Sequence, residues 1–387
     1  MADSNLAPVH DQPDRPPEPG MALCLSGGGY RAMIFHVGVL WRLNEAGLLG
    51  SLKRVSSVSG GSITAGVLAL HWHELAFAPG RPSAKFADFV VRPLRKLAST
   101  TIDEYSIIEG ILTPGMTISD YIAGNYDKHL FSEATLQDLP EDGDPARPAP
   151  RFVFNSTNVQ SGVLMRFSRP YMADYRVGRI DRPTLRLSRA VAASSAFPPV
   201  LSPCEIDAAD CGGEFVAEDG VDLNMPPYTK KLVLTDGGVY DNLGLETAFK
   251  RYDTIFASDA GGHYQPEPSP HHDWTRHSIR VLGLIDSQVR ALRARQLVAL
   301  FQQKERKGAY WSMRQDVAIY EGRSAALPCP VERTTELAQY PTRLAEMPDE
   351  IQERMINWGY AICDAALRTW FDAGLAQPAG FPYSRGV

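Results

Sequence analysis

Near the start of the chain, the pattern of an apolar run, a glycine turn and a helix occurs twice in succession. The first run, MALCLS, covers residues 21–26 and ends in three glycines, and residues 31–46 after it carry apolar side chains at helical spacing. The second run covers residues 52–58, and Gly60 and Gly61 separate it from another helical pattern. Two successive units of this kind predict a parallel sheet covered by helices.

Later apolar runs extend the predicted sheet. They indicate strands at residues 151–155, 231–234, 254–258 and 279–285. We therefore expect an α/β fold, a three-layer sandwich with a mainly parallel central sheet. Residues 86–140 have a mostly helical pattern, and a helical insertion of this length would be either a lid or a packed layer of helices.

The sequence predicts one domain over residues 21–375, because no linker rich in Gly, Ser or Pro and no internal repeat divides it. Residues 1–20 are rich in prolines and acids, lack the basic start and apolar stretch of a secretory signal, and predict a flexible tail. A helix with acids in its first turn is expected from Pro348 to about Trp370. Residues 376–387 are expected to form a C-terminal tail.

Charge and composition exclude several classes of protein. A formal net charge of −6 and a pI near 5.9 argue against a nucleic-acid binder, whose affinity comes mostly from neutralising phosphates. No stretch approaches the roughly 18 to 20 apolar residues that span a bilayer, so any membrane contact is expected to be peripheral. Five scattered cysteines fit a reducing cytoplasm. Cys204 and Cys211 flank three acids but lack the spacing of zinc ligands, which favours ordinary loop residues over a metal site.

Ser59 stands at the corner between the second strand and its helix, within the sequence SVSGG. This setting is typical of a nucleophile elbow, in which the residues two before and two after the serine are small because the chain passes close to itself. Glycine is usual at both positions, and here Ser57 occupies the first. Ser62 is a competing nucleophile with less suitable neighbours. The alternative is that these serines and glycines only cap a helix.

Gly27, Gly28 and Gly29 form the turn after the first strand. Glycines let several backbone N–H groups face one point, and the N-terminus of the following helix adds positive potential, so the turn predicts an anion-binding site. The anion would be a nucleotide phosphate or the oxyanion of an acyl-transfer intermediate. The chain lacks the phosphate-loop pattern G-x-x-x-x-G-K-[ST], and a nearby elbow serine favours the oxyanion.

Asp236 follows the strand-like run LVLT of residues 232–235 and precedes two glycines. A strand that leads into a glycine turn positions such an acid, and partial burial would raise its pKa toward the range of a general base. Asp259 has a similar setting and is the nearest alternative, while an ordinary turn aspartate is the non-functional one. No histidine has a comparable setting, since His36 falls inside a helix and His263 in a polar loop, so a Ser–His–Asp triad is the weaker hypothesis.

Three motifs, taken in their order, resemble the patatin family and its relatives, the cytosolic phospholipases A2. They are the turn SGGGYRA at residues 26–32, the serine elbow at Ser59, and DGG at Asp236. The resemblance covers most of the chain after residue 20. Its further segments are Asn155–Asn158, Ser194–Pro199, Asp241–Asn242, Tyr340–Thr342 and Asn357–Tyr360.

The resemblance implies a serine lipid acyl hydrolase of the phospholipase A or lysophospholipase type, with Ser59 and Asp236 as a catalytic dyad. Arg31 stands where the cytosolic relatives carry an arginine thought to meet the lipid phosphate, and pairing with a surface acid is the plain alternative for it. No metal, calcium or cofactor is implied, and the expected partner is a lipid or phospholipid. The oxyanion would be bound by the backbone N–H groups of Gly27, Gly28, Gly29 and Gly60.

A basic stretch with apolar residues at helical spacing runs from Arg290 to Lys307. Such an amphipathic helix would either lie on an anionic membrane surface or bury its apolar stripe in the protein core. Together with the scattered cysteines, this pattern leads us to expect a cytoplasmic protein. Peripheral membrane contact is one option, and the oligomeric state stays open.

Two other functions stay open beside the lipid hydrolase. One is a non-catalytic module that binds phosphate or nucleotide, and the other is an esterase or acyltransferase acting on a non-phospholipid ester.

Overall fold

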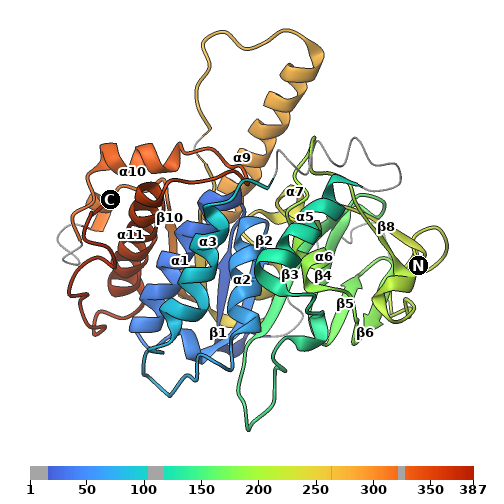
Figure 1. The fold of residues 1–387 in the computed structure, drawn as a ribbon, viewed down its shortest axis with the longest axis horizontal. Helices are drawn as coiled ribbons and strands as arrows, with labels where there is room; N and C mark the ends of the chain where they lie inside the picture. The colour runs from blue at the N-terminus through green and yellow to red at the C-terminus, as the bar shows by residue number, and fades with distance from the viewer. Residues whose placement is uncertain (1–15, 103–116, 263, 321–326) are drawn as a thin grey trace.

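The computed structural model describes residues 16–102, 117–262, 264–320 and 327–387. Figure 1 shows a central sheet with helices packed over it. Most of the predicted N-terminal tail lies outside the described residues, and the first strand begins at Glu18, slightly before the expected residue 21.

The strands in chain order are β1 (Glu18–Leu25), β2 (Leu52–Val58), β3 (Arg151–Asn158), β4 (Val163–Phe167), β5 (Tyr171–Asp174), β6 (Gly178–Asp181), β7 (Cys204–Asp207), β8 (Lys231–Asp236), β9 (Tyr252–Asp259) and β10 (Lys307–Ser312). The α-helices are α1 (Gly29–Glu45), α2 (Gly60–Leu70), α3 (Arg92–Ala98), α5 (Ile118–Tyr126), α6 (Leu187–Ser194), α7 (Gly238–Asp241), α8 (Glu246–Phe249), α9 (Trp274–Gln302), α10 (Val331–Ala338) and α11 (Asp349–Ala366). Shorter helical turns of 3-10 or π type cover Leu49–Ser51, Ala87–Val91, Asp127–Phe131, Leu136–Asp138, Ala208–Cys211, Val317–Tyr320 and Leu367–Phe371.

The predicted α/β fold is confirmed, and its sheet is mixed. Strands β10, β9, β1, β2 and β3 pair in parallel, in that order, and carry both glycine turns. Strands β4, β5 and β6 continue the sheet in antiparallel fashion, because connections of a few residues are too short for a parallel crossover. The C-terminal ends of β1, β2 and β9 therefore lie at one edge of the sheet, where ligand sites form in parallel sheets.

The residues of β1 alternate between two hydrophobic cores, as expected for a strand that is covered on both faces. Leu23 and Leu25 belong to a large core that also contains the buried sides of α1, α2 and α11. Ala22 and Cys24 belong to a smaller core that includes Leu297 from the second half of α9. The sheet thus forms the middle layer of the predicted three-layer sandwich.

Strands β2 and β8 meet end to end along one edge of β3. Strand β2 runs parallel to β3 and ends with Val58 opposite Asn155. Strand β8 comes from the other direction and ends with Asp236 opposite Ser156, the next residue of β3. Strand β4 occupies the other edge of β3 at these positions. The topology therefore brings the C-terminal ends of β2 and β8 together, although they are far apart in the chain.

The described part of residues 86–140 packs as a layer of helices. Leu94 and Leu97 of α3, Ile122 of α5 and Phe131 in the turn after it are all buried in the large core. Helix α3 contacts α1, and α5 contacts α6. Of the two predicted alternatives, these residues therefore form the packed layer.

The strand predicted at residues 279–285 is wrong, because these residues belong to helix α9. Asp273 caps this helix by accepting a hydrogen bond from the Arg276 N–H at 2.9 Å. Strands β9 and β10 pair directly with each other, so no strand is needed between them. The predicted basic helix is the second half of α9 and ends at Gln302. Figure 1 shows the first half of α9 rising above the body.

The C-terminal helix is present as α11 and continues as a helical turn to Phe371. Residues 376–387, predicted as a tail, have no regular secondary structure but pack against α11. The Asn357 side chain donates hydrogen bonds to the carbonyl oxygens of Tyr383 and Gly386, and Val387 is buried. Within the described residues, no helix combines the length and apolar character that spanning a membrane requires.

Candidate active site

Ser59 lies between β2 and α2 in a strained backbone conformation. Its φ of 51° and ψ of −123° fall in a region that residues other than glycine rarely adopt. The corner requires Gly60 and Gly61, because a Cβ at Gly60 would lie 2.1 Å from the Gly29 carbonyl oxygen and one at Gly61 would lie 2.5 Å from that of Leu25. This is the geometry of a nucleophile elbow.

The two neighbouring serines are buried below the elbow. The Ser62 hydroxyl donates to that of Ser57 at 3.0 Å and lies 2.8 Å from that of Ser194. The Ser57 hydroxyl donates to the Val153 carbonyl oxygen at 3.3 Å, so a serine fits where glycine is usual. Neither residue lines the pocket that Ser59 lines. Ser62 is therefore poorly placed to act as the competing nucleophile.

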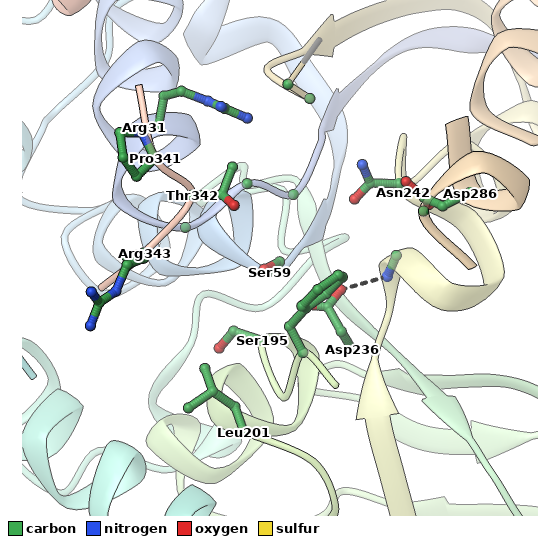
Figure 2. A pocket seen from close by; sticks show the side chains of 18 of the residues that line it. Arg31, Ser59, Ser195, Leu201, Asp236, Asn242, Asp286, Pro341, Thr342 and Arg343 are labelled. Atoms are coloured by element: carbon green, nitrogen blue, oxygen red, sulfur yellow. Dashed lines mark hydrogen bonds between the residues drawn. The ribbon is translucent and has the colours of Figure 1, made fainter. Parts of the chain in front are cut away.

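Asp236 ends β8 and is buried, with its carboxyl group at the same pocket as Ser59. Its Oδ1 accepts a hydrogen bond from the Gly238 N–H at 2.7 Å, drawn as the dashed line in Figure 2. Its Oδ2 has no hydrogen-bond partner among the described residues. The Ser59 hydroxyl lies near enough to lower the pKa of this carboxyl group. Hydrogen bonds between catalytic groups are often long before substrate binds.

Burial raises the pKa of Asp236 from 3.8 to about 7. The Gly238 N–H and the Ser59 hydroxyl lower this pKa, and the nearby charge of Asp286 raises it. The carboxyl group is thus poised to gain and lose a proton near neutral pH, as an efficient general base requires.

The C-terminal end of α6 and the residues that follow it hold Ser59 and Asp236 in place. The Ser194 carbonyl oxygen accepts hydrogen bonds from the Ser59 N–H at 3.2 Å and from the Gly237 N–H at 3.1 Å. The Ala196 carbonyl oxygen accepts one from the Asp236 N–H at 2.9 Å. The sequence marked this segment only through the family resemblance, and its positioning role could not be predicted because it depends on main-chain atoms.

The glycine turn between β1 and α1 forms one wall of the pocket. Gly27 lies so close to the elbow that a Cβ there would be 2.9 Å from that of Ser59. Its N–H donates to the Asn242 carbonyl oxygen at 3.2 Å and is therefore occupied. The other predicted amides have no partner among the described residues, namely those of Gly28, Gly29 and Gly60.

Arg31 lines the pocket from the first turn of α1, but its guanidinium is bound to the main chain. Nη1 donates to the carbonyl oxygens of Tyr340 at 2.7 Å and Ala338 at 3.2 Å, and Nη2 donates to that of Ala260 at 3.3 Å. Its buried Nε has no partner among the described residues. Arg31 thus connects the glycine turn to two other loops instead of pairing with a surface acid.

Asp259, the alternative base, does not line the pocket. Its Oδ2 accepts hydrogen bonds from the Tyr310 hydroxyl at 2.8 Å and from Arg314 Nη2 at 2.9 Å. Burial alone would raise the pKa of Asp259, but Arg290 and Arg314 outweigh burial and lower it. A carboxylate neutralised by arginines is a weak base, so the geometry favours Asp236.

Histidine does not contribute to the pocket within the described residues. The two ring nitrogens of His36 lie 3.0 Å from the Ser258 hydroxyl and 2.9 Å from the Ser26 carbonyl oxygen. Burial lowers the pKa of His36 to about 4, so this ring is neutral at pH 7. His263 lies outside the described residues.

The pocket has a volume of about 760 Å³ and opens at the C-terminal ends of the parallel strands. Figure 2 shows Ser59 and Asp236 at its centre, with Pro341 and Thr342 on one side and Asp286 on another. An apolar wall is formed by Phe197, Pro198, Pro199, Val200 and Leu201.

A family model for patatin-like phospholipases matches residues 23–249, which is more than half of the chain. The chain belongs to the patatin-like phospholipase family. The match includes the end of β1, all of β2 and β8, and every predicted site residue. No curated protein sequence matches the chain significantly.

Solved structures with a TM-score above 0.5 share the fold of this chain. Human GIVD cytosolic phospholipase A2 in complex with methyl γ-linolenyl fluorophosphonate is 17% identical with a TM-score of 0.52, and the alignment covers 90% of this chain and 57% of that one. The complex that also contains terbium chloride is 14% identical with a TM-score of 0.52, covering 90% and 58%. VipD from Legionella pneumophila is 16% identical with a TM-score of 0.31, covering 85% and 66%. The chain thus spans less than two thirds of the human protein's length.

The patatin-like match ends before α9, which adds two charged residues that the site prediction missed. Asp286 and Arg290 line the pocket, and Arg290 Nη2 donates to the Gly262 carbonyl oxygen at 3.0 Å. Burial raises the pKa of Asp286. These residues were missed because Asp286 directly follows the run mistaken for a strand, where a single acid carries no signal of its own.

The five cysteines form no disulfide bond with one another. Cys204 and Cys211 are buried and free, like the other three. Among the described residues, no three His, Cys, Asp or Glu side chains are grouped so that they could hold a metal ion.

Proposed function

We propose that this patatin-like protein is a serine hydrolase that cleaves fatty acyl esters of lipids, of the phospholipase A or lysophospholipase type. The observation that carries the proposal is the pairing of an elbow serine with a buried carboxyl group. Ser59 has the strained backbone of a nucleophile elbow. Asp236 lies at the same pocket, and its Oδ2 has no hydrogen-bond partner within residues 16–102, 117–262, 264–320 and 327–387. Family membership supports lipid as the substrate class.

In the proposed reaction, the Ser59 oxygen attacks the ester carbonyl carbon while its proton passes to the Asp236 carboxylate. The ester C–O bond then breaks, and the proton moves from Asp236 to the departing alcohol. Water attacks the acyl enzyme in the second half, Asp236 again accepts and returns the proton, and the fatty acid leaves. This mechanism uses no metal or cofactor.

The oxyanion that forms on the carbonyl oxygen needs donors that are ready before the reaction. We assign this role to the N–H groups of Gly28, Gly29 and Gly60. These three amides have no partner in the part of the chain that the structure describes, and the N-termini of α1 and α2 add positive potential. Gly27 contributes by lacking a side chain beside Ser59.

The pocket suits an acyl chain on one wall and a polar group on another. Phe197, Val200 and Leu201 provide apolar surface for the chain. Arg31 and Arg290 lie in the pocket lining, and each has a buried Nε without a partner among the described residues. A contact between Arg31 and a substrate phosphate stays a prediction.

A fluorophosphonate probe tests the proposal, because it forms a covalent adduct only with an activated serine. We expect mass spectrometry to find one adduct per chain, on Ser59. The variant Ser62→Ala is the matched control and should be labelled at the wild-type rate, since Ser62 lies below the pocket. Absence of labelling would favour the non-catalytic phosphate-binding module. Labelling with turnover of soluble esters but not of phospholipid vesicles would favour the non-phospholipid esterase.

The rate of hydrolysis is expected to rise with pH through about 7 and then level off. The base must be deprotonated, and burial places the pKa of Asp236 at about 7, so the active fraction increases about tenfold per pH unit below that value. The measurement is kcat/KM for a soluble ester over a range of about pH 5 to 9, which brackets this pKa. A rate that is already maximal at pH 5 would contradict Asp236 as the base.

A further inference from the structure

The first half of α9 exposes a stripe of apolar side chains along one face. The spacing of i, i+7, i+8, i+11, i+15 and i+18 places six of them on the same side of a helix. The exposed fraction is 81% for Trp274 and 62% for Leu282. The stripe consists of Trp274, Val281, Leu282, Ile285, Val289 and Leu292.

This stripe points away from the body of the protein. Arg290 and Leu297, which are the buried residues of α9, lie on the opposite face of the helix. A helix packed on a sheet normally turns its apolar face inward and its polar face to water. Large exposed apolar patches on soluble proteins mark interaction surfaces, so the stripe indicates a binding partner.

The stripe adjoins the mouth of the pocket. Gly283, Asp286 and Ser287 line the pocket from the same turns of α9 that carry the stripe. The apolar wall on another side of the pocket also reaches solvent, with Phe197 60% exposed and Val200 43% exposed. A partner surface that contacted both the stripe and the apolar wall would also cover the opening of the pocket, which lies between them.

The charges beside the stripe are balanced by ion pairs. Arg276 pairs with Asp273 at 2.7 Å, and Arg280 pairs with Glu267 at 2.8 Å. In the second half of α9, Arg290 is buried and Arg293 pairs with Glu246 at 3.3 Å. Arg295, Lys304 and Lys307 of the predicted basic stretch are exposed, but they lie beyond the first half of α9. Because the charges beside the stripe itself are paired, attraction of the stripe to the partner is expected to be mainly apolar.

We propose that the first half of α9 docks the protein on a lipid surface by inserting the apolar stripe. This inference rests on the proposed function, because a pocket that takes lipid must open toward lipid. The first half of α9 rises above the body (Figure 1). Trp274 is the first residue of this helix, and tryptophan favours the membrane–water interface. Insertion places the pocket mouth beside the bilayer and gives acyl chains a path that avoids water.

Flotation with phosphatidylcholine vesicles tests the docking, using full-length chains with Ser59→Ala so that no lipid is consumed. Ile285→Ser is expected to weaken binding about fivefold and Leu282→Ser with Ile285→Ser about twentyfold. Ile319→Ser is the matched control, because Ile319 is 51% exposed and Ile285 is 52% exposed, but Ile319 lies outside α9. The control should bind within about twofold of the parent.

Three results would overturn the docking proposal. The first is unchanged vesicle binding by the double variant, and the second is binding that disappears in ~1 M NaCl, where charge attraction is screened. The third is a dimer of the parent chain that the double variant converts to monomers in analytical ultracentrifugation, which would assign the stripe to a second copy.

Soluble-ester hydrolysis by the same α9 variants with Ser59 restored separates this proposal from the proposed function. We expect kcat/KM for a soluble ester to stay at the wild-type value, because neither Leu282 nor Ile285 lines the pocket. A chain that lacks hydrolytic activity but binds vesicles through α9 would contradict only the proposed function. A chain that hydrolyses esters but fails to bind vesicles would contradict only the docking.

Discussion

Replacing Asp236 by asparagine is expected to lower kcat for ester hydrolysis by about a thousandfold or more, the usual scale for loss of a positioned general base. The amide cannot accept the Ser59 proton. Its oxygen can still accept the hydrogen bond that the Gly238 N–H donates to Oδ1, so the local fold should persist. Steady-state kinetics and circular dichroism of the variant measure the two effects.

The same substitution is expected to raise stability at high pH. The pKa of Asp236 is about 7 in the folded state and 3.8 ordinarily, so the unfolded state releases its proton first as pH rises. The buried carboxyl group therefore costs increasing stability between these two pH values and a constant amount above about 7. Thermal unfolding should show that the asparagine variant gains stability at about pH 8 and gains little below about pH 4.

The kinetic experiment has its own contrary outcome. If the asparagine variant still hydrolyses esters, Asp236 is not the base, and Asp259 or a histidine would take that role.

Replacing Ser59 by glycine is expected to abolish turnover, by about 10⁴-fold or more, while making the folded protein more stable. Turnover is lost because the nucleophile is absent. Stability rises because glycine adopts a φ of 51° without the clash that a Cβ causes, which is worth about 1 kcal/mol. Urea unfolding and ester hydrolysis measure the two changes.

Ser59→Ala is the matched control for this experiment. Alanine removes the hydroxyl but keeps the Cβ, so activity should fall as far as in the glycine variant without a gain in stability. If both variants gain equal stability, the elbow is not strained at this residue. If either retains turnover with unchanged kinetics, Ser59 is not the nucleophile.

Much of the fold could be predicted from local patterns. The two strand, glycine turn and helix units near the start were expected because apolar runs and glycines stand directly beside each other in sequence. Asp236 could be singled out because an apolar strand leads into it. Its approach to Ser59 could not be derived from these patterns, since it depends on β8 continuing the edge of β3 where β2 ends.

The wrong strand has its physical origin in the rule that apolar runs are buried. Residues 279–285 were predicted as a strand because their apolar side chains suggested a buried position, whereas Ile279, Leu282 and Ile285 are exposed on α9. The short hairpins from β4 to β6 were likewise not expected, so the antiparallel part of the sheet was underestimated. An apolar run that binds a partner cannot be distinguished by its composition from one that packs in the core.

The Ser194 carbonyl oxygen accepts hydrogen bonds from the N–H groups of both Ser59 and Gly237. A single atom of α6 therefore anchors two loops that are far apart in the sequence. Thermal displacement of α6 therefore carries both loops along in the same direction. The separation between hydroxyl and carboxyl groups should then fluctuate less than the position of either group in the molecule. Substitutions in the core beneath α6 are accordingly expected to shift the whole site before they pull its two halves apart.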